Sequence, residues 1–166
     1  MSQISWLNKY LIDASAIFDF WLIQNRITRP YHVKVHKFRA IWEHITSLVE
    51  SGAVLVPQVI ADEISFADSE LLTWIDSHKN LFVDYDDCIE ELKRIVIDYP
   101  SYSRKRLNKL NDAILISIAM NKHLTLITSE HIRSIPSVNI PSIPNVCDHF
   151  SVQWMNLPEF FVTEGL

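Results

Sequence analysis

Glycine is scarce in this sequence: of 166 residues, only Gly52 and Gly165 are glycine. A chain of this length would hold roughly twelve at typical usage. Phosphate-binding loops and the dinucleotide fingerprint need several closely spaced glycines. The G-x-S-x-G nucleophile elbow needs two glycines four residues apart, whereas Gly52 and Gly165 are far apart in the sequence. The sequence therefore excludes nucleotide binding through such loops, and it excludes a serine hydrolase of the elbow type.

Cysteine and long apolar runs are also in short supply. Cys88 and Cys147 are the only cysteines, so neither a disulfide framework nor a four-cysteine zinc site can form. This usage fits a reducing compartment, and we expect a cytoplasmic protein. The N-terminus has no basic region followed by an apolar stretch, so no signal peptide is expected. The longest apolar run, 113–120, is far shorter than the about 20 residues of a membrane span, so no membrane association is predicted.

Short apolar runs alternate with helical patterns along the chain, and no repeat or linker divides it. Alternation of this kind predicts a single α/β domain over 1–166, with a three-layer α/β/α architecture and a short, mainly parallel sheet. Strands are expected near 10–12, 54–56, 81–83, 124–127 and 152–155. Helices are expected near 16–24, 35–49, 60–66, 71–75, 86–97, 111–120 and 157–162, with Ser15 as the cap of the first.

Four carboxylates lie where these strands end or where the adjoining helices begin. Asp13 follows the first strand, Glu63 lies one or two helical turns after the second, Asp112 opens a helix, and Glu130 follows Ile127 by three residues. The carboxyl ends of parallel strands form the working edge of such a sheet. Clustered carboxylates repel one another unless a cation neutralises them, and oxygen ligands suit Mg²⁺ or Mn²⁺. This pattern favours metal-assisted phosphodiester hydrolysis.

Each acid also has an ordinary structural interpretation. Asp13 and Asp112 could be helix caps, and Glu130 belongs to a polar turn. Glu63 could be a solvated helix acid, with Asp62 as a competitor for its role. Because adjacent helix positions point about 100° apart, only one of these two can face the crevice. The positions of Ile60 and Ile64 favour Glu63.

Taken in order, four segments resemble motifs of the PIN-domain ribonucleases, the fold of the toxin half of many bacterial toxin–antitoxin pairs. They are YLIDASA at 10–16, VPQVIADEI at 56–64, NDAILISIA at 111–119 and LITSE at 126–130. The ending, IPNVCDHF and then LPEFF, is similar to a less characterised prokaryotic PIN-like branch. The resemblance implies a ribonuclease that uses Mg²⁺ or Mn²⁺, an RNA substrate, an antitoxin partner and a homodimer.

The resemblance also implies roles for individual residues. The four acids of the family, catalytic and metal-binding, correspond in order to Asp13, Glu63, Asp112 and Glu130. Ser15 corresponds to the small polar residue that holds the geometry of the metal site, and the polar turn adds Thr128 and Ser129 as supporting residues. Two positions depart from the family pattern: Ala14 replaces a frequent threonine, and Glu130 is one methylene longer than the usual aspartate.

An acidic protein needs a local positive patch to approach RNA, since 20 acidic residues outnumber 15 basic ones. The densest basic run lies just before Asp112 and could dock the RNA backbone or be a solvated loop. Tyr99 and Tyr102 flank it and are predicted to stack on unpaired bases. The run comprises Arg104, Lys105, Arg106 and Lys109.

The early helices carry more large apolar side chains than one thin layer needs, which favours burial of some of them in a homodimer. These side chains are Phe18, Phe20, Trp21, Phe38 and Trp42.

Other functions fit the sequence less well. A non-catalytic interaction module of the same fold is the main alternative. A phosphoacceptor receiver would need an acidic pair on the first strand, and a haloacid-type phosphatase would need Asp-x-Asp, where this chain has Ser15. Zinc binding by His32 with His36, or by Cys147 with His149, lacks a third ligand.

Overall fold

A computed structural model of the chain describes residues 9–25, 35–65, 69–78, 82–104, 109–135, 138–139 and 141–166. Five short strands form a parallel sheet in the order β3-β2-β1-β4-β5. The predicted α/β alternation and parallel sheet are therefore confirmed. The strands are β1 (Tyr10–Ile12), β2 (Val54–Pro57), β3 (Phe82–Val83), β4 (Thr125–Ile127) and β5 (Trp154–Met155).

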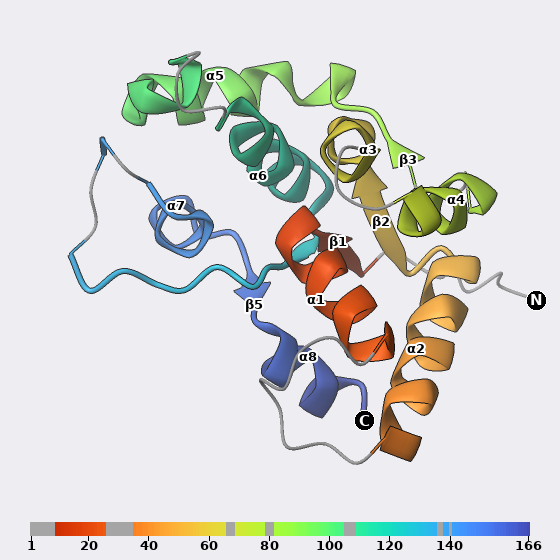
Figure 1. Ribbon diagram of the computed structural model, residues 1–166. Helices are drawn as coiled ribbons and strands as arrows, with labels where there is room; N and C mark the ends of the chain where they lie inside the picture. The colour runs from red at the N-terminus through yellow and green to blue at the C-terminus, as the bar shows by residue number, and fades with distance from the viewer. Residues whose placement is uncertain are drawn as a thin grey trace, which may run out of the picture.

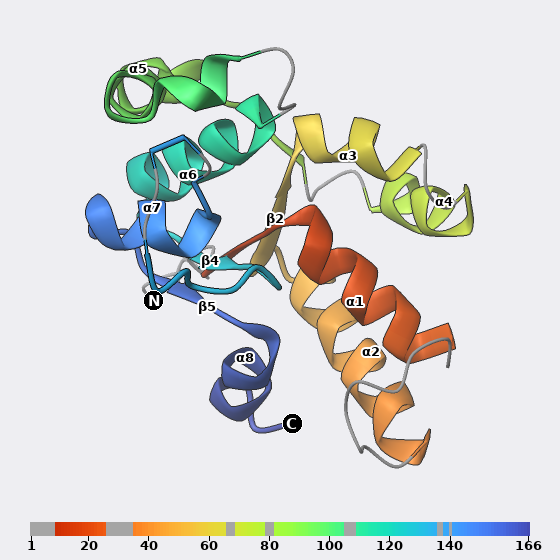
Figure 2. The same ribbon diagram turned by 60° about the vertical axis from the view of Figure 1, so that its left-hand side comes forward.

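Helices cover both sides of this sheet. In Figures 1 and 2, α1, α2 and α8 lie on one side, and α5, α6 and α7 lie on the other. The eight α-helices among the described residues are α1 (Ala14–Asn25), α2 (Val35–Glu50), α3 (Gln58–Ser65), α4 (Ser69–Ser77), α5 (Ile89–Asp98), α6 (Leu110–Lys122), α7 (Ile143–His149) and α8 (Leu157–Thr163). Two 3₁₀ turns, η2 (Asp86–Cys88) and η3 (Pro100–Ser103), adjoin α5.

Local sequence explains most of these boundaries. The apolar positions of α2 recur every three to four residues, and Ile45 and Val49 are buried, as their spacing predicts. The chain then turns at Gly52, whose φ of 75° is the left-handed conformation that glycine adopts most easily. Helix α8 begins with a capping box between Asn156 and Glu159.

Two local predictions were wrong. Ser15 does not cap α1, because the helix begins at Ala14, one residue before Ser15. The backbone N–H of Ile17 already donates to Asp13 O at 3.1 Å. Helix α7 was not expected, because it is only seven residues long and has Pro144 in its first turn.

The aromatic side chains of the early helices pack within the chain. Phe20 and Trp21 are buried, and the Trp21 ring lies 5.5 Å from that of Trp42, which lies 4.8 Å from Trp74. Phe18 is also partly buried against the core, whereas the side chain of Phe38 lies outside the described residues. These contacts give no support to the argument for a dimer from surplus aromatic surface, and the homodimer stays a prediction. No helix in the described part of the chain is long and apolar enough to cross a membrane.

Candidate active site

The carboxylate of Asp13 lies directly after β1 and is held by a network from two chain segments. The residue is only 6% exposed. Its Oδ2 accepts hydrogen bonds from Ser15 Oγ and, at 3.0 Å, from Thr128 Oγ1. Ser15 Oγ in turn accepts from the backbone N–H of Ser129 at 3.1 Å. Of the three residues predicted to support the site, Ser15 and Thr128 therefore bond directly to Asp13 through their side chains, and the Ser129 backbone holds Ser15 in place.

Glu130 is joined to the same network from the other side of Thr128. Its backbone N–H donates to Thr128 Oγ1 at 3.1 Å, and its Oε2 accepts from the backbone N–H of Ile143 at 2.8 Å. Glu130 is thereby anchored between the turn after β4 and the first residue of α7. Residues 128–130 form the polar turn that the sequence indicates. Glu130 also lies near enough to Asp13 for its charge to act on it.

Asp112 lies in the first turn of α6, where the helix dipole favours a negative charge. It is not the cap, since that position belongs to Lys109. The Lys109 ammonium Nζ lies 2.8 Å from Asp112 Oδ2 and 3.4 Å from Glu130 Oε1. One lysine therefore bridges two carboxylates from segments 18 residues apart in sequence.

Glu63 on α3 is tied to the start of α6. Asn111 Nδ2 donates to Glu63 Oε1 at 2.5 Å. Sequence reasoning did not assign Asn111 a role, and its place directly before Asp112 was the only signal available. The side chain of the competing Asp62 lies outside the described residues.

The charges of the predicted site acids reach Asp13 and Asp112. Burial raises the pKa of Asp13, hydrogen bonds from Ser15 and Thr128 oppose this, and the charges of Glu130 and Glu63 raise it further. Burial also raises the pKa of Asp112 to about 7 against the attraction of Lys109, and the charges of Glu130 and Asp13 add to the rise. Ionisation of Asp13 and of Asp112 is therefore less favourable than in water, first because they are buried and then because of the neighbouring carboxylates.

Two hydroxyl groups in this region are buried without a hydrogen-bond partner among the described residues, those of Tyr102 and Ser129. The Tyr102 side chain is 1% exposed. Burial raises the pKa of its hydroxyl, and the carboxylates of Asp112 and Glu130 add to the effect. Tyr99 is also buried, at 8% exposure. The prediction that these two tyrosines stack on RNA bases was wrong, because neither ring is accessible.

The donor chemistry of the cluster fits a hard divalent cation, because its carboxylate and hydroxyl groups all present oxygen. Yet no three His, Cys, Asp or Glu side chains in the described ranges stand close enough together to hold one metal ion. The Lys109 ammonium lies between Asp112 and Glu130 and supplies positive charge to both.

The predicted RNA-binding run is only partly described. Arg104 is exposed after η3, and Lys105 and Arg106 lie outside the described residues. Lys109 faces the acids rather than an open basic surface. Zinc binding was not favoured by the sequence. Cys147 is buried, His149 Nε2 lies 3.0 Å from Asp98 Oδ2, and His32 lies outside the described residues.

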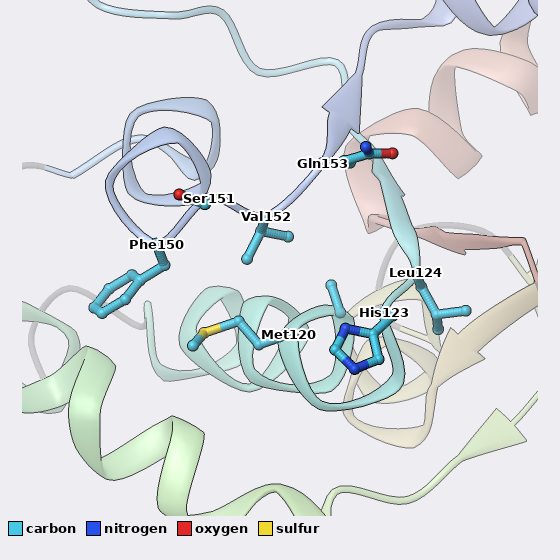
Figure 3. A pocket seen from close by; sticks show the side chains of 8 residues that line it. Met120, His123, Leu124, Phe150, Ser151, Val152 and Gln153 are labelled. Carbon is cyan, nitrogen blue, oxygen red and sulfur yellow. The ribbon is translucent and has the colours of Figure 1, made fainter.

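A separate cavity of about 450 Å³ lies at the opposite edge of the sheet, where β4 and β5 begin. Figure 3 shows Met120 and His123 on one side of this space and Phe150 and Val152 on the other. No acidic residue lines it. Its position and composition separate it from the carboxylate cluster.

Comparison with known proteins gives a family but no activity. Residues 10–166 match a protein family described as a domain of unknown function, DUF4411. No curated protein matches the chain. Because the match covers nearly the whole sequence, the chain belongs to the DUF4411 family.

Proposed function

We propose that this member of the DUF4411 family is a divalent-metal-dependent endoribonuclease of the PIN type, which hydrolyses phosphodiester bonds in RNA. The observation that supports the proposal is the convergence of four carboxylates from four separate segments. Asp13 is influenced by the charges of Glu63 and Glu130, and Asp112 by those of Asp13 and Glu130. Acids gathered in this way beside a parallel sheet need a cation, and a purely structural cluster would gain nothing from the repulsion.

In this proposal Asp13 and Asp112 hold Mg²⁺ or Mn²⁺, and Glu63 and Glu130 complete the site. The metal would supply an activated water and stabilise the charge that develops on phosphorus. The chain's own residues orient the ligands: Thr128 and Ser15 fix Oδ2 of Asp13, and Asn111 fixes Oε1 of Glu63. Burial of Asp13 excludes water from its hydrogen-bonded oxygen.

The resemblance to toxin-type PIN ribonucleases also suggests a role for the protein in the cell. We propose that the protein is the toxin of a toxin–antitoxin pair, acts in the cytoplasm, is neutralised by an antitoxin protein and forms a homodimer. The homodimer rests on the resemblance alone. Induced expression should arrest growth of a host cell, and Asp13→Asn should relieve the arrest if the ribonuclease is responsible.

The alternative is a non-catalytic interaction module with the same fold. One observation favours it: the Lys109 ammonium already neutralises part of the cluster's charge. In a module of this kind Lys109 would be the counter-charge of Asp112 and Glu130, and no divalent ion would be needed.

Replacing Asp13 by asparagine distinguishes the two, because it keeps the side-chain shape and removes one charge. With labelled single-stranded RNA and Mn²⁺ as the probe, cleavage should fall by about a hundredfold or more in Asp13→Asn and vanish in EDTA. Asp76→Asn, at an exposed position on α4, is the matched control and should cleave like the wild type. Cleavage that survives both Asp13→Asn and EDTA would rule out the metal mechanism, and purified protein without any cleavage would favour the module.

A further inference from the structure

Lys109 occupies an unusual position for a lysine from a basic run. Its Nζ lies 2.8 Å from Asp112 Oδ2 and 3.4 Å from Glu130 Oε1, and its side chain is only 25% exposed. The two acids are similarly covered, at 19% and 29% exposure. A single ammonium group is thus shared between two acids of the candidate metal site.

A second lysine pair in the same protein shows what an ordinary surface contact looks like here. Lys93 Nζ lies 2.7 Å from Glu90 Oε1 on α5, with the same three-residue spacing, but these side chains are 61% and 80% exposed. Exposed pairs of this kind contribute little to stability and are readily exchanged for contacts with solvent. Lys109 differs because burial makes its ammonium dependent on the carboxylates around it.

The oxygens that hold Lys109 are those a metal ion would use. An ammonium group can donate hydrogen bonds to carboxylate oxygens but cannot share them with a cation placed at the same point. The buried hydroxyl of Tyr102 lacks a partner in the described part of the chain, and the charges of Asp112 and Glu130 act on it. The buried hydroxyl of Ser129, which directly precedes Glu130, also lacks a partner there. Buried polar groups are nearly always satisfied in native structures. The cluster arranged around Lys109 therefore leaves polar groups for a further ligand.

We propose that Lys109 is a resident counter-cation of the acid cluster, which a divalent ion must displace before it binds. This inference rests on the metal site of the proposed function. It accounts for the placement of one half-buried ammonium group within reach of both Asp112 and Glu130. Once displaced, the Lys109 side chain is available to an RNA phosphate, so that metal binding and substrate binding reinforce each other.

The first test measures Mn²⁺ binding by calorimetry at constant pH and ionic strength, without RNA. Lys109→Met should bind Mn²⁺ on the order of tenfold more tightly than the wild type, because the competing charge is gone. Lys109→Arg keeps the charge and should stay close to the wild type. Lys93→Met is the matched control, and its Mn²⁺ affinity should not change.

The second test uses the unaltered protein, so it does not depend on whether the Lys109→Met variant folds. Acylation of lysine amines, read residue by residue by mass spectrometry, should be slow at Lys109 without metal. It should accelerate as Mn²⁺ is added, over the same concentrations that saturate the calorimetric titration. Lys93 should react at one rate throughout.

The outcomes separate the two hypotheses. Equal Mn²⁺ affinity in the wild type and Lys109→Met, with unchanged acylation of Lys109, would overturn the displacement inference and leave the metal site standing. Absence of Mn²⁺ binding in both proteins would overturn the metal site and the inference together. Tighter binding in Lys109→Met that is abolished by adding Asp13→Asn would support both.

Discussion

The two ends of strand β4 are built on different principles. At its carboxyl end, Thr128 and Glu130 join a network of acids and hydrogen bonds around Asp13. At its amino end, His123 and Leu124 line a cavity of about 450 Å³ with no acidic residue (Figure 3). The carboxyl end of β4 thus adjoins a group of acids, and its amino end adjoins a cavity without acids.

This difference follows from the direction of the helices that meet each end. Helix α1 begins directly after β1, and α6 carries Asp112 in its first turn, where the dipole favours carboxylates. At the other end, α6 finishes and the chain must reverse into β4, which it does through His123 at a φ of 53°. Ser151, at a φ of 57°, plays the same part after α7. The carboxyl end therefore carries electrostatic repulsion, and the amino end carries backbone strain.

The largest expected contrast between the two ends is in catalysis. Asp112→Asn at the carboxyl end should lower Mn²⁺-dependent RNA cleavage by about a thousandfold, because a metal-binding charge is lost. Gln153→Ala, which alters the cavity at the other end, should leave cleavage within about twofold. Rates measured under single-turnover conditions decide this. A comparable loss in Gln153→Ala would show that the cavity is part of the active site.

The burial of Asp112 at the carboxyl end should also affect the pH dependence of stability. Burial raises the pKa of Asp112 from its usual 3.8 to about 7. The folded protein then binds more protons than the unfolded chain in this window, so stability falls as the pH rises from about 4 to about 7. Asp112→Asn should reduce that fall by about 3 kcal/mol. Urea unfolding in EDTA at several pH values measures it.

The exposed Asp76→Asn variant again provides the control, and its pH profile should match that of the wild type. An identical slope in Asp112→Asn and the wild type would mean that Asp112 titrates normally in the folded protein.

A smaller effect separates neighbouring acids on α3. Glu63→Ala should reduce cleavage about tenfold, because Glu63 is the acid fixed by Asn111. Asp62→Ala should leave cleavage nearly intact. The reverse pattern in the same cleavage assay would transfer the role to Asp62.

The smallest effect concerns the strained turns at the amino end. His123→Gly and Ser151→Gly should each stabilise the fold by about 1 kcal/mol, because glycine adopts a positive φ without the penalty of a Cβ. Ser47→Gly, at an exposed position inside α2, should destabilise it by about 1 kcal/mol. Urea unfolding of the three variants gives the comparison. Destabilisation by all three would show that the two turns carry no strain.

The sequence by itself determined the α/β alternation, most element boundaries and the positions of four acids near strand ends. These features are local: apolar spacing, a glycine at the end of α2 and polar residues after each apolar run are visible within a few residues. The resemblance to a known family added the role of Ser15 as a support, and its hydroxyl does bond to Asp13. The role of the four acids in catalysis stays a prediction.

Only the tertiary structure decided which surface each side chain meets. Lys109 belongs to a basic run in the sequence, but its partner Glu130 lies 21 residues further along the chain and reaches it only after β4 pairs with β1. Tyr102 looks like an exposed aromatic beside that run, yet it is buried near Asp112. Contacts between distant segments depend on the packing of the whole sheet. The spacing of residues within one segment does not predict them.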